Sequence, residues 1–292
     1  MVTRFALAAS DIQFSLEVFP PKSEAGLGNL LATVDAYAAL RPSAITVTFT
    51  ARRTPQAVAY MRDVVSQLAA RTSIPVAAHL TCAGRSRAEI DDILAALWND
   101  GTRSIVALRG DTPEVTGPYQ PHPQGYATTA DFISAVRARY PAMKILVAGY
   151  PETHPESPSA EFDLAHLKRK VDAGADGVLT QFFFDPEVFL RWRDRVVAQG
   201  IRVPLVPGLL PILSFPRMVG FAGKCNAHVP GFLHTMFEGV DPNSVDHKLL
   251  AMNVLSHQIT RLIEHGVTSF HFYTLNDTLL TRHVCTWLRM AF

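Results

Sequence analysis

The stretch Lys144-Ile-Leu-Val-Ala-Gly-Tyr-Pro-Glu-Thr-His-Pro-Glu156, continued further on by Thr180-Gln-Phe-Phe-Phe-Asp185, shows the pattern on which the whole chain is built. Residues 145–148 are a short apolar run typical of a buried β-strand, and a polar, proline-containing loop follows it. Ser159 is a good N-cap for the next helix, and residues 178–184 form a second apolar run. The order is therefore strand, loop, helix, strand, which is the unit of a parallel α/β fold.

The same unit repeats along the chain. Strands are expected at 13–19, 44–50, 75–82, 104–108, 145–148, 178–184, 203–211 and 268–275. Helices are expected at 28–40, 55–70, 86–101, 129–139, 159–170, 186–199, 214–225, 246–265 and 277–290, with a less regular stretch at 229–245. Eight such units favour an α/β fold of the closed (β/α)8 TIM barrel type, as a single domain over residues 1–292. An open dinucleotide-binding sheet fits less well, because no glycine-rich phosphate loop follows the first strand.

Composition narrows the class of protein. The chain has 292 residues, of which 48% are hydrophobic and 18% charged, and a net charge of +1. This balance gives no reason to expect nucleic acid or an anionic membrane as a partner. The three cysteines are far apart and match no zinc spacing, so we expect neither a metal site nor a disulfide framework. With no signal peptide and no membrane-spanning run, the sequence predicts a cytoplasmic protein.

Polar side chains near the ends of the expected strands are candidates for function, because in such a barrel the carboxyl ends of all strands face one mouth. They are Glu17, Thr48, His79, Thr81, Arg109, Asp111, Tyr150, His154, Gln181, Asp185, Tyr273 and Asn276. Glu17 is the most informative, because it interrupts an apolar strand. A buried carboxylate must be paired or neutral, and a neutral carboxylic acid is what a general acid requires. His79, His271 and Tyr273, each taken alone, are better explained as satisfied core residues.

The expected helix after residue 159 contains one more pattern. Asp163, His166 and Lys170 are spaced so that they share one face. An acid for a ribose hydroxyl and a lysine for a phosphate would suit a nucleotide. A solvated charged face explains the same spacing.

An ordered set of motifs resembles the methylenetetrahydrofolate reductase family over nearly the whole chain. The matching stretches are Leu16-Glu-Val-Phe-Pro-Pro21, His79-Leu-Thr-Cys82, Ile105-Val-Ala-Leu-Arg-Gly-Asp111, Tyr150-Pro-Glu-Thr-His-Pro-Glu156, Leu167-Lys-Arg-Lys-Val-Asp-Ala-Gly-Ala175, Thr180-Gln-Phe-Phe-Phe-Asp185, Pro207-Gly-Leu-Leu-Pro211 and His271-Phe-Tyr-Thr-Leu-Asn276. The resemblance implies a catalytic barrel with non-covalent FAD. In this family a nicotinamide, NADH or NADPH, reduces the flavin, which then reduces 5,10-methylenetetrahydrofolate to 5-methyltetrahydrofolate.

The resemblance also implies roles for individual residues. Glu17 matches the acid that protonates the folate ring nitrogen, and Asp111 matches a second catalytic residue near the flavin and the pterin. The implied substrate-binding positions are Glu17, Asp111, Gln181, Arg217, Phe221 and Leu275. The implied flavin-binding positions are Thr48, His79, Arg109, Gly110, Asp111, Tyr126, Ala127, Tyr150, His154, Asp163, His166, Arg169 and Lys170. By the same resemblance we expect folate and nicotinamide as ligands and a homo-oligomer.

The chain departs from the family pattern at several of these positions. Thr48-Phe49-Thr50-Ala51, followed by two arginines, replaces a glycine-containing segment, which alters how closely the backbone approaches a flavin. His166 stands where an asparagine is usual, Arg217 where a glutamine is expected and Asp277 where an arginine is expected. A physiological role in the oxidative direction is compatible with these changes.

Two other readings of the sequence remain open. A folate-binding barrel methyltransferase would use Asp111 and Gln181 but would not need the flavin positions. A non-catalytic folate-binding subunit would not need Glu17. A protein without flavin that still binds folate would favour the methyltransferase, and a Glu17→Gln variant with unchanged function would favour the binding subunit.

Overall fold

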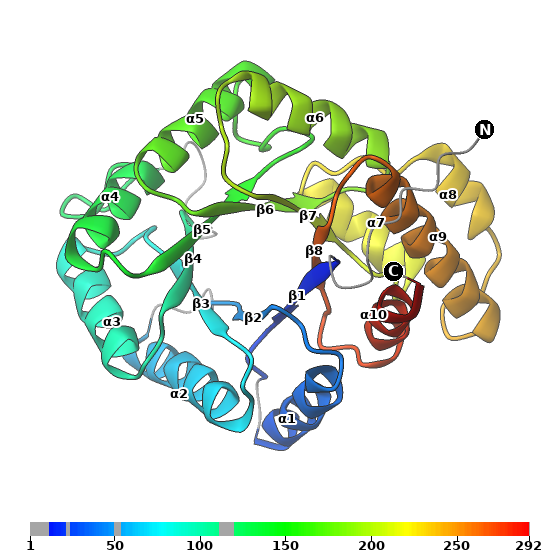
Figure 1. Cartoon of the computed structure of the whole chain (residues 1–292), viewed down its shortest axis with the longest axis horizontal. Helices are drawn as coiled ribbons and strands as arrows, with labels where there is room; N and C mark the ends of the chain where they lie inside the picture. Colours follow the sequence, from blue (N-terminus) through cyan, green and yellow to red (C-terminus); the bar gives the residue numbers. More distant parts are fainter. Residues whose placement is uncertain (1–11, 22–23, 50–53, 111–119, 292) are drawn as a thin grey trace.

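A computed structural model of the chain describes residues 12–21, 24–49, 54–110 and 120–291. Eight parallel strands pair in sequence order and close into a barrel, which confirms the predicted (β/α)8 fold (Figure 1). The strands are β1 (Gln13–Val18), β2 (Ala44–Val47), β3 (Val76–Thr81), β4 (Ser104–Leu108), β5 (Lys144–Gly149), β6 (Gly177–Phe182), β7 (Leu205–Leu209) and β8 (Ser269–Tyr273).

Helices surround the barrel, and α8 and α9 lie outermost on the side of β7 and β8 (Figure 1). The helices are α1 (Glu24–Ala38), α2 (Pro55–Arg71), α3 (Arg87–Asn99), α4 (Thr129–Arg139), α5 (Ala160–Asp172), α6 (Pro186–Ala198), α7 (Phe215–Lys224), α8 (Gly231–Met236), α9 (Val245–Glu264) and α10 (Leu279–Ala291). None of the described helices is long and apolar enough to cross a bilayer.

Side chains at the helix starts explain where most helices begin. Ser159, the predicted N-cap of α5, accepts a hydrogen bond from a backbone N–H in the first turn, and the N-cap side chains of Thr54, Ser86, Thr128 and Asp185 do the same for α2, α3, α4 and α6. Ser214 occupies the N-cap of α7 without such a bond. The sequence did not predict α8, which is a six-residue helix within the stretch expected to be irregular. Its length is too short to show a helical repeat, and burial of Leu233 holds it in place.

The strands alternate between two environments. Leu16, Val18, Ile45 and Val47 are fully buried on the outer face, between the sheet and the helices. The residues between them point into the barrel. Glu17 is in register with Thr46 on β2 and with Tyr273 on β8, so these three side chains share one layer of the interior.

The loop after β8 fastens the first strand to the last. The Asn276 side chain donates to the Phe19 carbonyl oxygen at 2.9 Å and accepts from the Phe19 N–H at 3.0 Å. The Thr274 hydroxyl donates to the Glu17 carbonyl oxygen at 2.6 Å. Leu275 and Asn276 both adopt left-handed backbone angles, with φ of 51° and 56°. For leucine this conformation is strained, and the flanking hydrogen bonds hold it there.

Candidate active site

A cavity of about 530 Å³ opens at the carboxyl ends of the strands. Its wall consists of the inward-pointing residues of the strands and of the loops that follow them. The lining residues are Glu17, Phe19, Thr48, His79, Val106, Leu108, Ala148, Tyr150, His154, Pro155, Leu179, Gln181, Phe182, Leu210, Phe221, Lys224, Cys225, Tyr273 and Leu275. Within the described part of the chain, no group of three His, Cys, Asp or Glu side chains could hold a metal ion.

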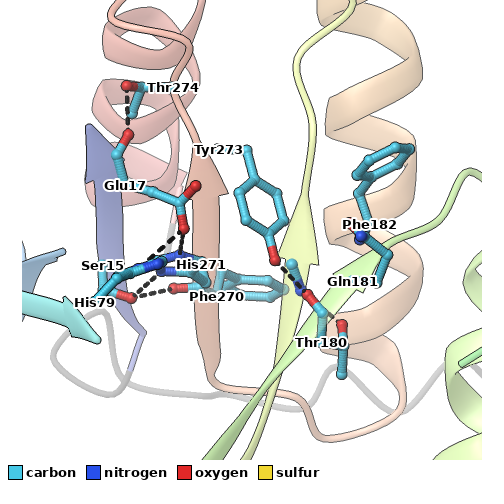
Figure 2. Close-up of polar contacts among 11 residues, drawn as sticks. Ser15, Glu17, His79, Thr180, Gln181, Phe182, Phe270, His271, Tyr273 and Thr274 are labelled. Carbon is cyan, nitrogen blue, oxygen red and sulfur yellow. Dashed lines mark hydrogen bonds and ion pairs between the residues drawn. The ribbon is translucent and has the colours of Figure 1, made fainter. Parts of the chain in front are cut away.

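Glu17 points into this cavity and lies between two histidines (Figure 2). Its Oε2 atom is 3.4 Å from Nε2 of His79 and 3.5 Å from Nε2 of His271. The His271 side chain is completely buried, and His79 is nearly so. Three titratable groups from β1, β3 and β8 therefore meet at one point of the barrel interior.

Opposing effects act on the Glu17 carboxyl. Burial raises its pKa, but positive charge on His79 and the hydrogen bond and charge of His271 lower it, and the net pKa lies below the usual glutamate value. Burial in turn lowers the pKa of His79, partly offset by the charge of Glu17. The structure thus differs from the simple neutral acid that burial alone suggests. The two imidazoles therefore favour the ionised form of Glu17 more than burial disfavours it.

Ser15 gives Nδ1 of His271 a hydrogen-bond partner. Its hydroxyl lies 2.8 Å from Nδ1 of His271 and 3.5 Å from the Phe270 carbonyl oxygen (Figure 2). With neutral His271 donating from Nε2 to Glu17, the hydroxyl can donate to Nδ1. With protonated His271, Nδ1–H donates to the hydroxyl, which turns toward the carbonyl. Both protonation states therefore find hydrogen-bond partners.

Tyr273 closes the cavity between β6 and β8. Its hydroxyl donates to the Thr180 carbonyl oxygen at 2.7 Å, and burial raises its pKa well above the usual value. Gly208 makes room for this ring, because a Cβ there would lie 2.1 Å from the Thr180 carbonyl oxygen and 2.6 Å from the ring. Tyr273 is thus a fixed wall of the site rather than a proton donor.

The opposite wall carries an amide and aromatic rings. The Gln181 Oε1 atom accepts from the Phe182 N–H at 3.0 Å, while its NH₂ group has no hydrogen-bond partner among the residues that the structure describes. The rings of Phe182 and Phe221 stack with centroids 5.3 Å apart and an angle of 25°. Phe221 is 44% exposed, and Phe19 and Leu275 at the mouth are exposed to a similar degree. This wall offers a flat ligand an apolar surface with one polar anchor.

Basic groups gather on the third side, between β5 and α5. Lys170 is buried, and its Nζ donates to the Ala148 carbonyl oxygen at 2.5 Å. Burial lowers the pKa of Lys170 to about 8, although Asp163 opposes this. Burial and the positive charges of Lys170, Arg169, His154 and Arg109 lower the pKa of His166 to about 4. The charge of Lys170 thus acts on His166, and the charge of Asp163 acts on Lys170, in keeping with their helical spacing.

Some of these groups already have partners. Asp163 accepts from the His154 N–H at 3.3 Å, and burial raises its pKa. Arg109 forms a two-pronged ion pair with Glu156, at 2.5 and 2.9 Å. The His154 ring packs edge-on against Tyr150 at 4.6 Å. The β5–α5 side is therefore a prearranged polar surface with more positive than negative groups.

The structure brings together many of the residues singled out from the sequence. Those that line the cavity are Glu17, Thr48, His79, Tyr150, His154, Gln181, Phe221 and Leu275. Those around its β4 and β5 sides, outside the lining, are Arg109, Gly110, Asp163, His166, Arg169 and Lys170. Arg217 is exposed on α7.

Two of the expected flavin positions do not line the cavity, and others lie outside the described residues. The Tyr126 hydroxyl donates to Asp91 of α3 at 3.3 Å, with Arg87 over its ring, and neither Tyr126 nor Ala127 lines the cavity. Asp111 and the 50–53 part of the altered segment fall outside the described residues.

Sequence reasoning missed several residues of the site. Phe19 and Lys224 line the cavity, and His271, taken as a core histidine, contacts Glu17. The position of His271 two residues before Tyr273 gave a usable signal, because both must point to the same side of β8. Phe19 and Lys224 gave none, since their positions depend on how the loop after β1 and the end of α7 fold over the barrel.

Comparison with known proteins places this geometry in a family. The model of the family described as methylenetetrahydrofolate reductase matches residues 3–289. The 5,10-methylenetetrahydrofolate reductases of Salmonella typhimurium and Escherichia coli are 39% and 38% identical to the chain over 274 residues, which is 94% of this chain and 90% of each relative. Methylenetetrahydrofolate reductase (NADH) 1 of Arabidopsis thaliana is 33% identical over 278 residues, or 90% of this chain and 46% of the plant protein.

Solved structures that resemble the chain share its fold at low identity. An uncharacterised Clostridium thermocellum protein that binds two copies of 5-methyl-5,6,7,8-tetrahydrofolic acid superimposes with a TM-score of 0.66, at 11% identity and 96% coverage of each chain. Dihydropteroate synthase from Xanthomonas albilineans gives 0.56, at 14% identity and covering 98% of this chain and 95% of that one. The match to the family model and the bacterial relatives settle the classification: this chain belongs to the methylenetetrahydrofolate reductase family.

Proposed function

We propose that this protein catalyses the reduction of 5,10-methylenetetrahydrofolate to 5-methyltetrahydrofolate, with FAD as cofactor and NADH or NADPH as reductant. Membership of the family supports the reaction. Within the structure, the observation that carries it is Glu17, held between two histidines in the wall of a cavity of about 530 Å³. This reaction needs a proton donor next to a flat heterocycle, and the cavity offers both.

The residues present fit a dinucleotide flavin. The basic surface between β5 and α5 suits a pyrophosphate, since burial and four positive neighbours already lower the pKa of His166. His79 Nε2 is buried, and its contact with Glu17 Oε2 at 3.4 Å falls short of a hydrogen bond, so this nitrogen retains capacity for a polar ring atom. We infer that Arg109, Tyr150, His154, Asp163, His166, Arg169 and Lys170 hold the cofactor on this side, with Thr48 and His79 nearer the ring. When bound, a flavin supplies two-electron transfer between the nicotinamide and the folate.

Glu17 delivers the proton in this mechanism. As the five-membered ring of the substrate opens, its ring nitrogen takes a proton from Glu17, and the carboxylate that remains is stabilised by His79 and His271. Ser15 adjusts its hydrogen bonds as the charge on His271 changes. Because its pKa lies below the usual glutamate value, Glu17 must act from its protonated form, and the carboxylate left behind is the form that the two histidines stabilise.

The wall formed by β6 and α7 binds the rings of the folate and the nicotinamide. The NH₂ group of Gln181, which bonds to none of the described residues, offers a hydrogen bond to the pterin, and Phe221 with Phe182 provides a stacking surface for the folate or the nicotinamide ring. Leu275 and Arg217 complete the substrate positions that we propose. Asp111, which follows β4 and Gly110, is proposed as the second catalytic residue, and we also infer a cytoplasmic, homo-oligomeric protein that acts as one barrel domain.

Anaerobic stopped-flow absorbance on the purified protein tests the proposal. We expect a yellow protein whose flavin band bleaches on mixing with a nicotinamide and returns on mixing with methylenetetrahydrofolate. Comparison of the two nicotinamides identifies the reductant, and mixing with 5-methyltetrahydrofolate tests the oxidative direction. A colourless protein that still binds folate would contradict the proposal and point to a methyltransferase or a binding subunit.

A further inference from the structure

Hydrogen bonds join the loop after β5 to the loop after α7. The Asn226 side-chain NH₂ donates to the carbonyl oxygens of Glu152 and Thr153, each at 3.2 Å. The His228 N–H donates to both carboxylate oxygens of Glu152, each at 3.1 Å. We call these four residues the loop bridge. Because β6 lies between β5 and β7 in the barrel, the loop bridge connects two segments that the sheet itself does not pair.

Both segments carry residues of the cavity wall. Tyr150 and His154, on either side of the β5 part of the loop bridge, line the cavity. On the other side, Cys225 lines the cavity and directly precedes Asn226, and Phe221 lies about one helical turn earlier. The four residues of the loop bridge are themselves outside the lining. They are therefore placed to set the position of the two walls rather than to contact a ligand.

The backbone on both sides of the loop bridge is left-handed, with φ of 55° at Asn226 and 72° at Thr153. Asparagine tolerates this conformation, but a β-branched threonine is strained in it. Strain of this kind persists only where surrounding contacts hold it, and it is concentrated at functional sites. The Thr153 carbonyl oxygen accepts from Asn226, and its N–H donates to the Tyr150 carbonyl oxygen at 3.1 Å. The loop bridge thus holds a strained residue next to His154.

The Glu152 carboxylate ties the two loops together energetically. This side chain is half-buried, and burial raises its pKa, while the N–H and the charge of His228 lower it. A carboxylate that has lost part of its water needs hydrogen-bond donors, and here the other loop supplies them. Separation of the loops would leave this carboxylate without those bonds.

We propose that the loop bridge is a positioning device for hydride transfer, which fixes the ring-binding surface at Phe221 relative to the cofactor side at Tyr150 and His154. The inference rests on the proposed function. Transfer between two rings requires their reacting atoms to be held in near contact, and a small displacement of either ring lowers the rate strongly. Because the nicotinamide and the folate rings are both assigned to Phe221, the loop bridge should matter for both half-reactions.

Asn226→Gly tests this inference in the holoenzyme, because glycine keeps the left-handed backbone and removes only the amide. Anaerobic stopped-flow measures flavin reduction by the nicotinamide and reoxidation by methylenetetrahydrofolate over a range of concentrations. Both limiting rate constants should fall roughly fivefold to tenfold, while the two Kd values change by less than about twofold. Glu152→Ala should reproduce this result. Glu152→Gln should stay close to the wild type, because its amide oxygen still accepts from the His228 N–H.

Amide hydrogen exchange gives a second measurement that does not depend on turnover. In the reduced wild-type protein, saturating 5-methyltetrahydrofolate should slow exchange in residues 222–229 and also in residues 151–157. In Asn226→Gly the protection of residues 222–229 should remain, and the protection of residues 151–157 should weaken. Asn243→Gly makes the same substitution in the loop before α9 and should leave rates and exchange unchanged.

Two results would overturn the inference. One is wild-type rate constants in both Asn226→Gly and Glu152→Ala. The other is faster exchange throughout the barrel in these variants, which would assign the loop bridge to stability alone. A wild-type protein that binds no flavin or reduces no folate would instead overturn the proposed function.

Discussion

The two facing walls of the cavity carry different kinds of side chain. The wall of β8, β1 and β3 holds Glu17 and two buried histidines, in contact at 3.4 and 3.5 Å. The wall of β6 and α7 holds an amide and stacked rings, and its Phe221 is 44% exposed. Buried, mutually supporting ionisable groups suit proton transfer, while a half-exposed aromatic surface suits ligands that enter and leave. The comparison indicates that one wall of the barrel transfers the proton and the other binds the ligand rings. Mutations on the first wall should therefore change rates and pH profiles, and mutations on the second should change Kd and KM.

Glu17→Gln should have the largest effect, since it removes the proton donor while preserving the shape of the side chain. We expect turnover of methylenetetrahydrofolate to fall by roughly 10²–10⁴-fold. Reduction of the flavin by a nicotinamide requires no proton from this wall and should persist. Rapid mixing of each half-reaction measures both quantities, and folate turnover at the wild-type rate would refute the role assigned to Glu17.

Gln181→Leu tests the other wall. The substitution removes the amide that we assign to the pterin but keeps the volume of the side chain. Loss of one buried hydrogen bond should raise the Kd for folate about tenfold, and should leave reduction by the nicotinamide much less affected. Anaerobic equilibrium titration of the reduced protein with 5-methyltetrahydrofolate, in which no hydride transfer can occur, measures the change. An unchanged Kd would mean that the pterin does not contact this amide.

His271→Phe should have a smaller effect on rate and a distinctive effect on pH dependence. His271 lowers the pKa of Glu17 through its hydrogen bond and its charge, so its removal should raise that pKa. A donor with a higher pKa stays protonated to higher pH, and the alkaline limb of the folate half-reaction should therefore move upward. The rate at the optimum should fall about fivefold, as expected for one lost hydrogen bond.

The matched control for His271→Phe is Ser15→Ala, which removes only the hydroxyl next to Nδ1. It should shift the pH profile less than His271→Phe does. If both variants changed the rate without moving the limb, the histidine would be holding the structure rather than tuning the proton donor.

Phe221→Leu should have the smallest effect. A ligand ring that stacks on Phe221 gains about 0.5–1.5 kcal/mol beyond its buried area, so loss of the aromatic face should raise KM by about threefold. Because nothing on the proton wall changes, the pH profile should coincide with that of the wild type. A shifted profile would show that the two walls are not independent.

Particular residues show which features of the fold and the site could be predicted from the sequence. Alternation of apolar strands with capped helices was enough for the barrel, and Ser86 and Thr128 both form the capping boxes that local sequence favours. Glu17 was recognisable as an interior carboxylate because it interrupts an apolar strand. The direction of its pKa was not, because that depends on His79 and His271, which only closure of the barrel brings close.

Loops and helix ends were less accessible to sequence reasoning. Tyr126 is expected at the flavin only from the family resemblance, and the structure adds that its side chain contacts Asp91 and Arg87 of α3. Nothing in its local sequence records that contact, because α3 lies an entire β/α unit earlier in the chain. Lys224 likewise reaches the cavity only because of the path that α7 takes, and a strand-end argument could not include it.

The contacts between β1 and β8 have a consequence for how the protein is made. Glu17 meets His271 across 254 positions of sequence, and its carbonyl oxygen meets Thr274 across 257. During synthesis from the amino terminus, the acid is present almost from the start, but its partners emerge near the end. A chain arrested before β8 can form many β/α units and still lacks the environment that sets the acidity of Glu17. Enzymatic activity in this protein therefore reports completion of the barrel, and its appearance during translation or refolding should lag behind the gain of helical structure.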